Sequence, residues 1–450
     1  MSAKKTVKKK AVTKKNVKKK STQVMFADTL PGVNSAVHQV FDHFGGAKKL
    51  LKKSGDVYLK VNAIDLKMYS YTDPEVIRAV IQYFKDGGAR NIYVIENCTQ
   101  GNFTRLVFRA TGMEQVCRET GAIPVYLDET DSVPVYLEGV EQFIDISSFV
   151  YQKLILEADQ NLYVSLPKLK THSMTEVTLS IKNQFGLVHQ FSRIADHNFR
   201  LHQKFADIYQ VIRPDFALVD GLVATNHGHY IAEKNKDECI VPMNCLIGGP
   251  DPMAVDVAAA SFIGYGLKDV KHLTLAAQKN LGESKLSNIE IVNKDIYNKR
   301  KKKLTHQLLD KFPPDVTILR GEERCCREGC RRNTETCMEV FYTDYDGKGG
   351  FTVLMGKGID PKAVAKIDGP VHIAGSCAIQ DYGMELEQRL GKGRVTMSHG
   401  CNNLAETIHG LSRHMKVSTL ELAGVNPFTS LGALIQARLH KTRANIPPVF

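Results

Sequence analysis

The feature that most constrains the fold is a repeated alternation of short apolar runs with segments of helical periodicity. The runs at 57–61 and 91–96 have the length and composition of buried strands. Between them, apolar residues recur at helical spacing after Pro74, and Gly87 and Gly88 end that helix. Strands separated by helices are typical of a parallel sheet with helices on both faces. The sequence therefore predicts an α/β fold with a doubly wound, mostly parallel sheet.

The alternation occurs in two blocks, which predict two domains. The first block adds strands at 123–127, 161–166, 216–220 and 245–247, and helices at 103–119 and 251–263. The second block predicts strands at 316–319, 351–355, 371–374, 395–398 and 419–422, and helices near 328–342, 361–367, 382–390 and 403–414. No clear signal follows Gly424. We expect an α/β domain at 23–293, a basic connector at 294–312 and a smaller Rossmann-like domain at 313–450.

The net charge of +12 is concentrated in two short segments. Residues 1–20 contribute +10 and the run at 299–303 contributes +5, so the rest of the chain carries −3. A segment with so little apolar surface is predicted to be disordered, and we assign 1–22 as a Lys-rich tail. Such a tail binds nucleic acid weakly and without sequence preference, or serves only as a solvated appendage.

The sequence also indicates where in the cell the protein is located. No run approaches the roughly 20 apolar residues of a membrane-spanning helix, and the N-terminus has no apolar core of a secretory signal. We therefore expect a cytoplasmic protein without membrane association. In a reducing compartment, the ten cysteines indicate metal or redox chemistry more often than structural disulfides.

Five cysteines lie just after predicted strands of the smaller domain: Cys325, Cys326, Cys330, Cys377 and Cys401. Ligands of open α/β sheets bind beyond the carboxyl ends of the strands, so these loops are expected to bring thiols to one edge. Four thiolates are the ligand set of a [4Fe–4S] cluster. The predicted ligands are Cys326, Cys330, Cys377 and Cys401, with Cys325 as the alternative to Cys326.

Two alternatives remain open for these cysteines. A zinc site can use four cysteines, although zinc sites usually show close C-x₂-C pairs and these ligands come singly from distant loops. Ordinary buried cysteines, which are common in protein cores, need no metal. Gly329, Gly375 and Gly400 favour a cluster, because they stand beside cysteines where the backbone must approach a bulky inorganic group.

Polar residues also end the strands of the larger domain and predict an anion site. Cationic side chains around a histidine favour a phosphate or carboxylate ligand, and a histidine can act as acid or base near neutral pH. The predicted catalytic residues are Lys60, Lys170 and His172, and the predicted substrate-binding residues are Asn62, Glu96, Lys168, Lys182, Asn183, Asp220 and Asp251. Three of these residues also have purely structural interpretations, which are a helix cap for Asp251, a turn at Asp220 and a solvated loop at Lys168.

Two further sets of residues are candidate metal ligands. Asp220, Asp251 and Asp256 could hold Mg²⁺, which prefers carboxylate oxygens. Five histidines also occur within 41 residues, an enrichment that fits either metal ligation or a surface loop: His189, His197, His202, His227 and His229.

Five segments of the larger domain resemble, in order, the family called domain of unknown function 362. They are YLKVN, YTDPEVIRAVI, LPKLKTHSMTEVTLSIKNQFGL, PDFALVDGL and GGPDPMAVDVAAA. They cover about residues 55–285, and the KxKTH…T…KN segment is the most specific. The resemblance implies an α/β fold and an association with iron–sulfur proteins, whose ferredoxin-type cysteine motifs often accompany this domain. This chain has no tandem C-x₂-C-x₂-C run, so any cluster must use the dispersed cysteines.

These observations lead to one principal hypothesis and two alternatives. We expect an iron–sulfur redox enzyme or electron-transfer protein of the cytoplasm, with an anionic small molecule in the first domain and a redox partner protein. The first alternative is a non-redox enzyme that uses the Lys/His/Asp site with Mg²⁺ or another metal, in which the cysteines are structural. The second is a polyanion-associated protein that works through the Lys-rich tail.

Overall fold

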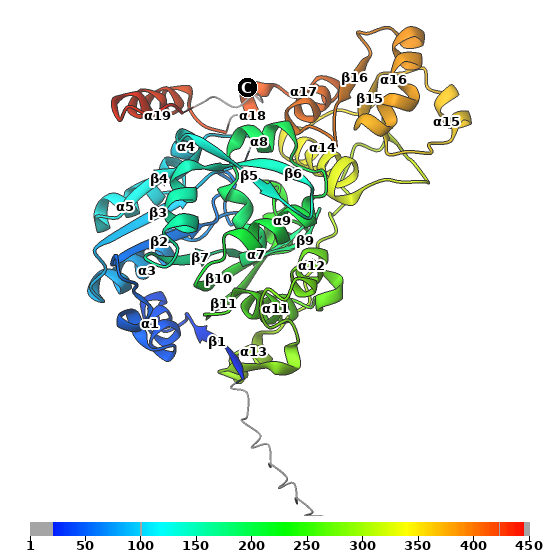
Figure 1. The fold of residues 1–450 in the computed structure, drawn as a ribbon. Helices are drawn as coiled ribbons and strands as arrows, with labels where there is room; N and C mark the ends of the chain where they lie inside the picture. Colours follow the sequence, from blue (N-terminus) through cyan, green and yellow to red (C-terminus); the bar gives the residue numbers. More distant parts are fainter. Residues whose placement is uncertain (1–20, 100, 423, 445–450) are drawn as a thin grey trace, which may run out of the picture.

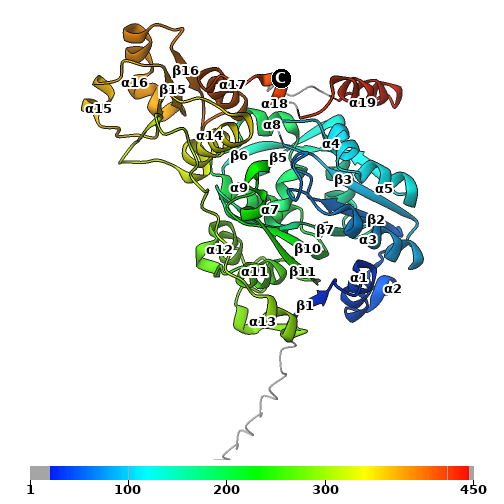
Figure 2. The same ribbon diagram turned by 180° about the vertical axis from the view of Figure 1, so that it is seen from behind.

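The computed structural model describes residues 21–99, 101–422 and 424–444. The predicted tail at 1–22 falls outside them except for its last two residues, and Thr22 already begins the first strand. The chain forms a larger α/β domain and a smaller domain that projects from one end of it, drawn in yellow and orange in Figure 1 and seen from behind in Figure 2.

The larger domain is built on a ten-stranded sheet. Its strands are β1 (Thr22–Asp28), β2 (Asp56–Val61), β3 (Asn91–Glu96), β4 (Ile123–Tyr126), β7 (Leu162–Leu166), β8 (Lys168–His172), β9 (Glu176–Thr178), β10 (Phe216–Thr225), β11 (Ile240–Gly249) and β12 (Ile289–Val292). The order is β12-β1-β11-β10-β7-β2-β3-β4, with β8 beside β10 and β9 beside β8. Strands β10, β7, β2, β3 and β4 are parallel, so their carboxyl ends share one edge.

Helices cover both faces of this sheet, as a doubly wound fold requires. On one face lie α1 (Val33–His43), α2 (Gly46–Leu50), α3 (Pro74–Asp86), α4 (Thr104–Ala110) and α5 (Met113–Thr120). The other helices of the domain are α6 (Ser148–Val150), α7 (Ser180–Asn183), α8 (Gln190–Ala195), α9 (Leu201–Val211), α10 (Lys236–Cys239), α11 (Pro252–Phe262), α12 (Lys271–Gln278) and α13 (Lys294–Arg300). Helices α9, α11 and α12 pack on the opposite face of the sheet from α1 and α3, which gives the domain two apolar cores.

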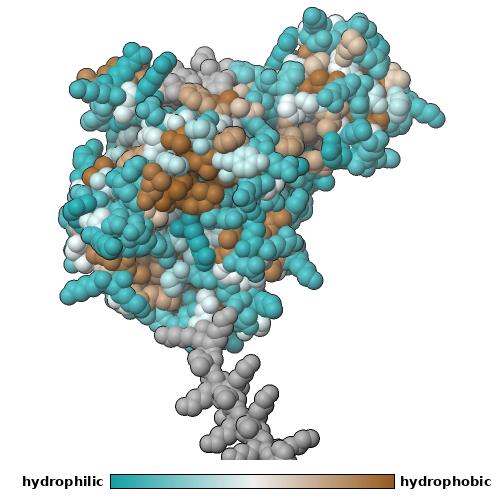
Figure 3. All heavy atoms as spheres, in the orientation of Figure 1, coloured by the Kyte–Doolittle hydropathy of each residue, from teal (hydrophilic) through white to brown (hydrophobic). Residues whose placement is uncertain are grey.

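A separate hairpin of β5 (Ser132–Leu137) and β6 (Gln142–Ser147) lies against the larger domain. It exposes the rings of Tyr136 and Phe143, whose centroids are 5.1 Å apart. Figure 3 shows apolar side chains gathered on the face of the domain where this hairpin lies. Among the described residues, no helix has both the length and the apolar composition that crossing a membrane requires.

The smaller domain contains a four-stranded parallel sheet in the order β13-β14-β15-β16. Its strands are β13 (Thr317–Arg320), β14 (Thr352–Met355), β15 (Val371–Ala374) and β16 (Val395–Ser398), and its helices are α14 (Arg332–Tyr345), α15 (Pro361–Ala365), α16 (Ser376–Leu390) and α17 (Leu404–Met415). Two more helices follow, the short α18 (Thr419–Leu422) and the longer α19 (Pro427–Leu439), and α19 returns to pack on α4. The predicted α/β fold class is confirmed in both domains.

Two predicted elements are wrong and one strand was not predicted, each for a local reason. The segment 419–422 is a helix and not a fifth strand, because periodicity cannot distinguish the two over four residues. The helix predicted at 103–119 is two helices, divided at Gly112, whose φ of +81° cannot continue an α-helix. The segment Lys168–His172 forms the strand β8, for which no element was predicted.

Candidate functional site

A cavity of about 220 Å³ lies between the carboxyl edge of the large sheet and helices α14 and α17 of the smaller domain. Its polar side is formed by the ends of β2 and β3, by α7 and by the segment that follows α8. Its apolar side is formed by side chains from both domains: Met174, Phe185, Leu201, Phe205, Val340, Phe341, Leu404 and Ile408. Enclosure between two domains and convergent polar groups are typical of small-molecule sites.

The polar side begins with a buried network around Lys60, at the end of β2. Lys60 Nζ lies 2.5 Å from Glu96 Oε1 and donates to Asn183 Oδ1 at 3.4 Å. Asn183 Oδ1 also accepts from Asn62 Nδ2 at 3.1 Å. Burial lowers the pKa of Lys60, which the adjacent Glu96 carboxylate partly offsets. Asn62 Oδ1 has no hydrogen-bond partner among the described residues, so it can accept a hydrogen bond from a ligand.

Lys182 is the unpaired cation of this cavity. Its ammonium lies 5.5 Å from the centre of the Phe205 ring, and none of the described residues accepts a hydrogen bond from it or forms an ion pair with it. Burial and the nearby Lys60 charge lower the pKa of Lys182 to about 7. An uncompensated, partly buried cation favours an anion in the space beside it.

Two stacked histidines stand next to this cation. The ring centroids of His172 and His229 are 3.5 Å apart and the rings are stacked nearly parallel, with 6° between their planes. Burial, reinforced by the nearby Lys182 charge, holds the pKa of both rings well below 6.5, so both are neutral at pH 7. His229 Nδ1 has no hydrogen-bond partner among the described residues. As neutral imidazoles, the two rings can accept or donate hydrogen bonds to a bound molecule.

Other predicted site residues serve the framework of the fold. Lys168 Nζ pairs with Asp220 Oδ2 at 2.8 Å, and the same oxygen accepts from Asp73 N at the start of α3. Lys170 Nζ donates to the carbonyl of Ser70 at 2.5 Å and does not line the cavity. Asp251 caps α11 through Met253 N and Ala254 N.

The three aspartates considered for Mg²⁺ also have separate roles. Asp256 accepts from Ser180 N and Ile181 N, both at 2.8 Å, and burial raises its pKa to about 8. Asp220 and Asp251 have framework roles as well, so the three aspartates do not share one metal site. Among residues 21–99, 101–422 and 424–444, their oxygens do not form a group close enough to ligate one ion.

The predicted cysteines gather at the carboxyl edge of the small sheet. Cys326 and Cys330 flank the turn before α14, Cys377 lies in the first turn of α16, and Cys401 lies between β16 and α17. Burial, together with the charges of neighbouring thiols on all three loops, raises the pKa of Cys330 to about 12. A Cβ atom on Gly375 would lie 2.4 Å from Cys330 Sγ, so only glycine lets the α16 loop approach this thiol.

The structure distinguishes the members of the Cys325-Cys326 doublet. Cys326 is exposed, and partial burial together with the nearby charges of Glu328 and Cys377 raises its pKa. Cys325 packs on the apolar core of the smaller domain. Cys337, on α14, lines the cavity and is separate from the thiol group.

The chain is similar to known proteins over part of its length. Residues 57–261 match the family model described as domain of unknown function (DUF362). The predicted family resemblance is thereby confirmed for this part of the chain. A thylakoid-associated protein of Synechocystis is 26% identical over 259 residues, which cover 55% of this chain and 74% of that protein. A Thermotoga maritima protein of known crystal structure aligns with 84% of this chain and 82% of its own, at 10% identity and a TM-score of 0.36.

The DUF362 segment supplies most of the polar side of the cavity, whereas the four predicted cluster ligands and helices α14 and α17 lie outside it. Several lining residues were not predicted as site residues: Asp65, Asn97, Arg193, His197, Asn198, His229 and Tyr230. His197 and His229 were considered only as candidate metal ligands, among the five histidines at 189–229. Arg193 and Asn198 come from the short helix α8 and the irregular chain after it, where no periodicity signals a site.

The Lys168–Asp220 pair of the DUF362 segment should be structural. Asp220→Ala leaves a buried lysine unpaired and removes an acceptor at the start of α3, so we expect a loss of about 3–5 kcal/mol in unfolding free energy. Chemical denaturation measures this loss. The control is Asp346→Ala, which breaks an exposed pair with Lys234 and should cost far less, because surface ion pairs contribute little. Equal effects of the two changes would contradict the assignment.

Proposed function

We propose that this protein is an iron–sulfur redox protein that acts on an anionic small molecule bound between its two domains. The observation that supports this most is the adjacency of the cysteine edge and the cavity. Asn198, which lines the cavity, donates through Nδ2 to the carbonyls of Cys401 and Asn402 at 2.9 and 3.2 Å. One side chain therefore spans the distance from the cavity to a loop that presents a predicted cluster ligand.

The donor set fits a cluster better than a single ion. Four thiols from three loops lie near enough to influence one another electrostatically, and thiolates are the usual ligands of [4Fe–4S] clusters. Among the described residues, no three cysteines have sulfurs within 4.8 Å of one another, whereas one zinc ion requires such closeness. A cluster holds its thiolates further apart because they bind different iron atoms. When bound, it would supply one-electron transfer chemistry beside the cavity.

The cavity suggests the kind of substrate. Its volume suits a small metabolite, and Lys182 with the neutral histidine pair suits a carboxylate or phosphate at one end. The rings of Phe185, Phe205 and Phe341 suit an apolar portion at the other end. Cys326 and Cys401 are exposed, which leaves the cysteine edge accessible to a redox partner protein.

Anaerobic purification tests this proposal. The full chain should be brown, contain about four iron and four sulfide per chain, and show a reversible loss of visible absorption on reduction. Reconstitution with iron and sulfide under the same conditions controls for loss of the cluster during purification. A chain that remains colourless and free of sulfide after reconstitution would contradict the proposal.

A further inference from the structure

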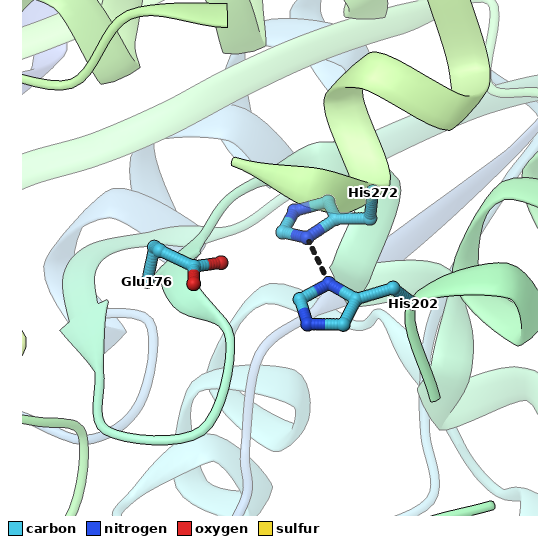
Figure 4. Close-up of side chains that lie close together, drawn as sticks. All are labelled: Glu176, His202 and His272. Atoms are coloured by element: carbon cyan, nitrogen blue, oxygen red, sulfur yellow. Dashed lines mark hydrogen bonds between the residues drawn. The ribbon is translucent and has the colours of Figure 1, made fainter. Parts of the chain in front are cut away.

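Three buried side chains outside the cavity and the cysteine edge form a compact group. They are Glu176 from β9, His202 from α9 and His272 from α12, with exposed fractions of 2%, 3% and 0%. One ligand atom from each lies within 4.8 Å of the other two. Figure 4 shows the Glu176 carboxylate pointing toward the two imidazole rings. The ring of Phe205 contacts both histidines and separates the group from the cavity.

The spacing of the two histidines suits a shared ion. Their Nδ1 atoms face each other at 3.4 Å. This separation is long for a hydrogen bond, in which a nitrogen donor lies about 2.7–3.2 Å from its acceptor. Two nitrogens bound at about 2.0–2.1 Å to a tetrahedral ion are about 3.4 Å apart, which follows from the tetrahedral angle.

An unpartnered polar atom gives a second, independent indication. Glu176 Oε2 is buried and has no hydrogen-bond partner in the part of the chain that the structure describes. The other carboxylate oxygen, Oε1, contacts the Arg327 guanidinium. A carboxylate held on one side by arginine can ligate an ion with its free oxygen. Buried polar atoms without partners are costly, and an ion at this point would give the carboxylate oxygen a partner.

The geometry points to a single divalent metal ion bound by His202 Nδ1, His272 Nδ1 and Glu176 Oε2, separate from the cysteine cluster. Two imidazoles and one carboxylate suit Zn²⁺ and similar late first-row ions, whereas Mg²⁺ and Ca²⁺ prefer oxygen ligands. Three protein ligands leave a fourth position for water.

The position of the group indicates a role in domain arrangement. The ion would fasten β9, α9 and α12 to one another. Arg327 directly follows Cys326, and its contact with Glu176 joins this group to the cysteine-bearing loop. A bound ion would therefore hold the Glu176 side chain, and through Arg327 the loop of the smaller domain, in one place.

Co²⁺ titration of the full chain, dialysed against a chelator and kept anaerobic, tests this inference. Nitrogen and oxygen ligation gives Co²⁺ d–d absorption without the near-ultraviolet charge-transfer band of thiolate ligation, so the spectrum distinguishes this site from the cysteines. We expect one Co²⁺ of the first kind per chain and a higher melting temperature on binding. His272→Gln should weaken this binding by about 100-fold or more, since even the loss of an outer-shell partner costs about 10–100-fold.

The matched control is His189→Gln, which changes another buried histidine of the same domain that caps α8. It should bind Co²⁺ with the wild-type spectrum and affinity. Glu176→Gln provides a second test if the His272 variant does not fold, and it should also weaken binding. The inference is overturned if wild type shows only thiolate charge-transfer bands, or if folded His272→Gln or Glu176→Gln binds Co²⁺ as wild type does.

Discussion

Replacing Cys377 or Cys401 by alanine is expected to abolish the iron–sulfur cluster or convert it to a form with less iron. Each residue is alone on its loop, Cys377 in the first turn of α16 and Cys401 after β16. Cys325 lies on the loop before α14 and not on either of these two loops. Iron and sulfide per chain and visible absorption measure the effect. The smaller domain should also lose stability, because the cluster links its loops.

Cys337→Ala is the control for these variants. This cysteine is also on the smaller domain, but it lies on α14 and lines the cavity, and burial raises its pKa to about 12. Its removal should leave iron content and visible absorption unchanged. If the Cys377 and Cys401 variants keep full iron and the wild-type spectrum, the ligand assignment is wrong.

The strands of both sheets were predictable where apolar runs are short and sharply bounded. The runs at 91–96, 371–374 and 395–398 match β3, β15 and β16 to the residue, because each is bounded by turn residues or by glycine. Prediction failed where tertiary context decides. Strand β8 contains Lys168 and Lys170, and it exists because β10 and β9 pair with it on either side.

Part of the site was predictable for a related reason. Parallel strands end at a common edge, so Lys60 and Glu96 had to meet once β2 and β3 were neighbours. Along β8, the position of each polar residue decides whether it contacts the framework of the fold or the cavity. Lys168 and Lys170 lie on the body of the strand and contact framework groups, whereas His172 at its end reaches the cavity. The apolar side could not be predicted, because it depends on how the smaller domain docks.

Lys182→Met is expected to remove most anion binding without destabilising the free protein. An anion in the cavity would pair with this otherwise unpartnered ammonium, and losing one member of such a buried pair costs about 2 kcal/mol or more, which is about 30-fold or more in Kd. Isothermal titration calorimetry with phosphate and small carboxylates measures the loss. The control is Lys204→Met, because Lys204 is buried but pairs with Asp196 at 3.0 Å. It should lower stability and leave anion binding unchanged.

The pH dependence makes this prediction specific to Lys182. Its pKa of about 7 in the free protein means that wild-type affinity should be constant at low pH and fall about tenfold per pH unit above 7, as the ammonium loses its proton. Stability should show the opposite trend. The pKa is lowered from 10.5, so between about pH 7 and 10.5 the unfolded chain binds more protons, and the unfolding free energy from this group rises with pH. Both dependences should be absent from Lys182→Met. Wild-type affinity in that variant, or an unchanged pH profile, would place the anion elsewhere.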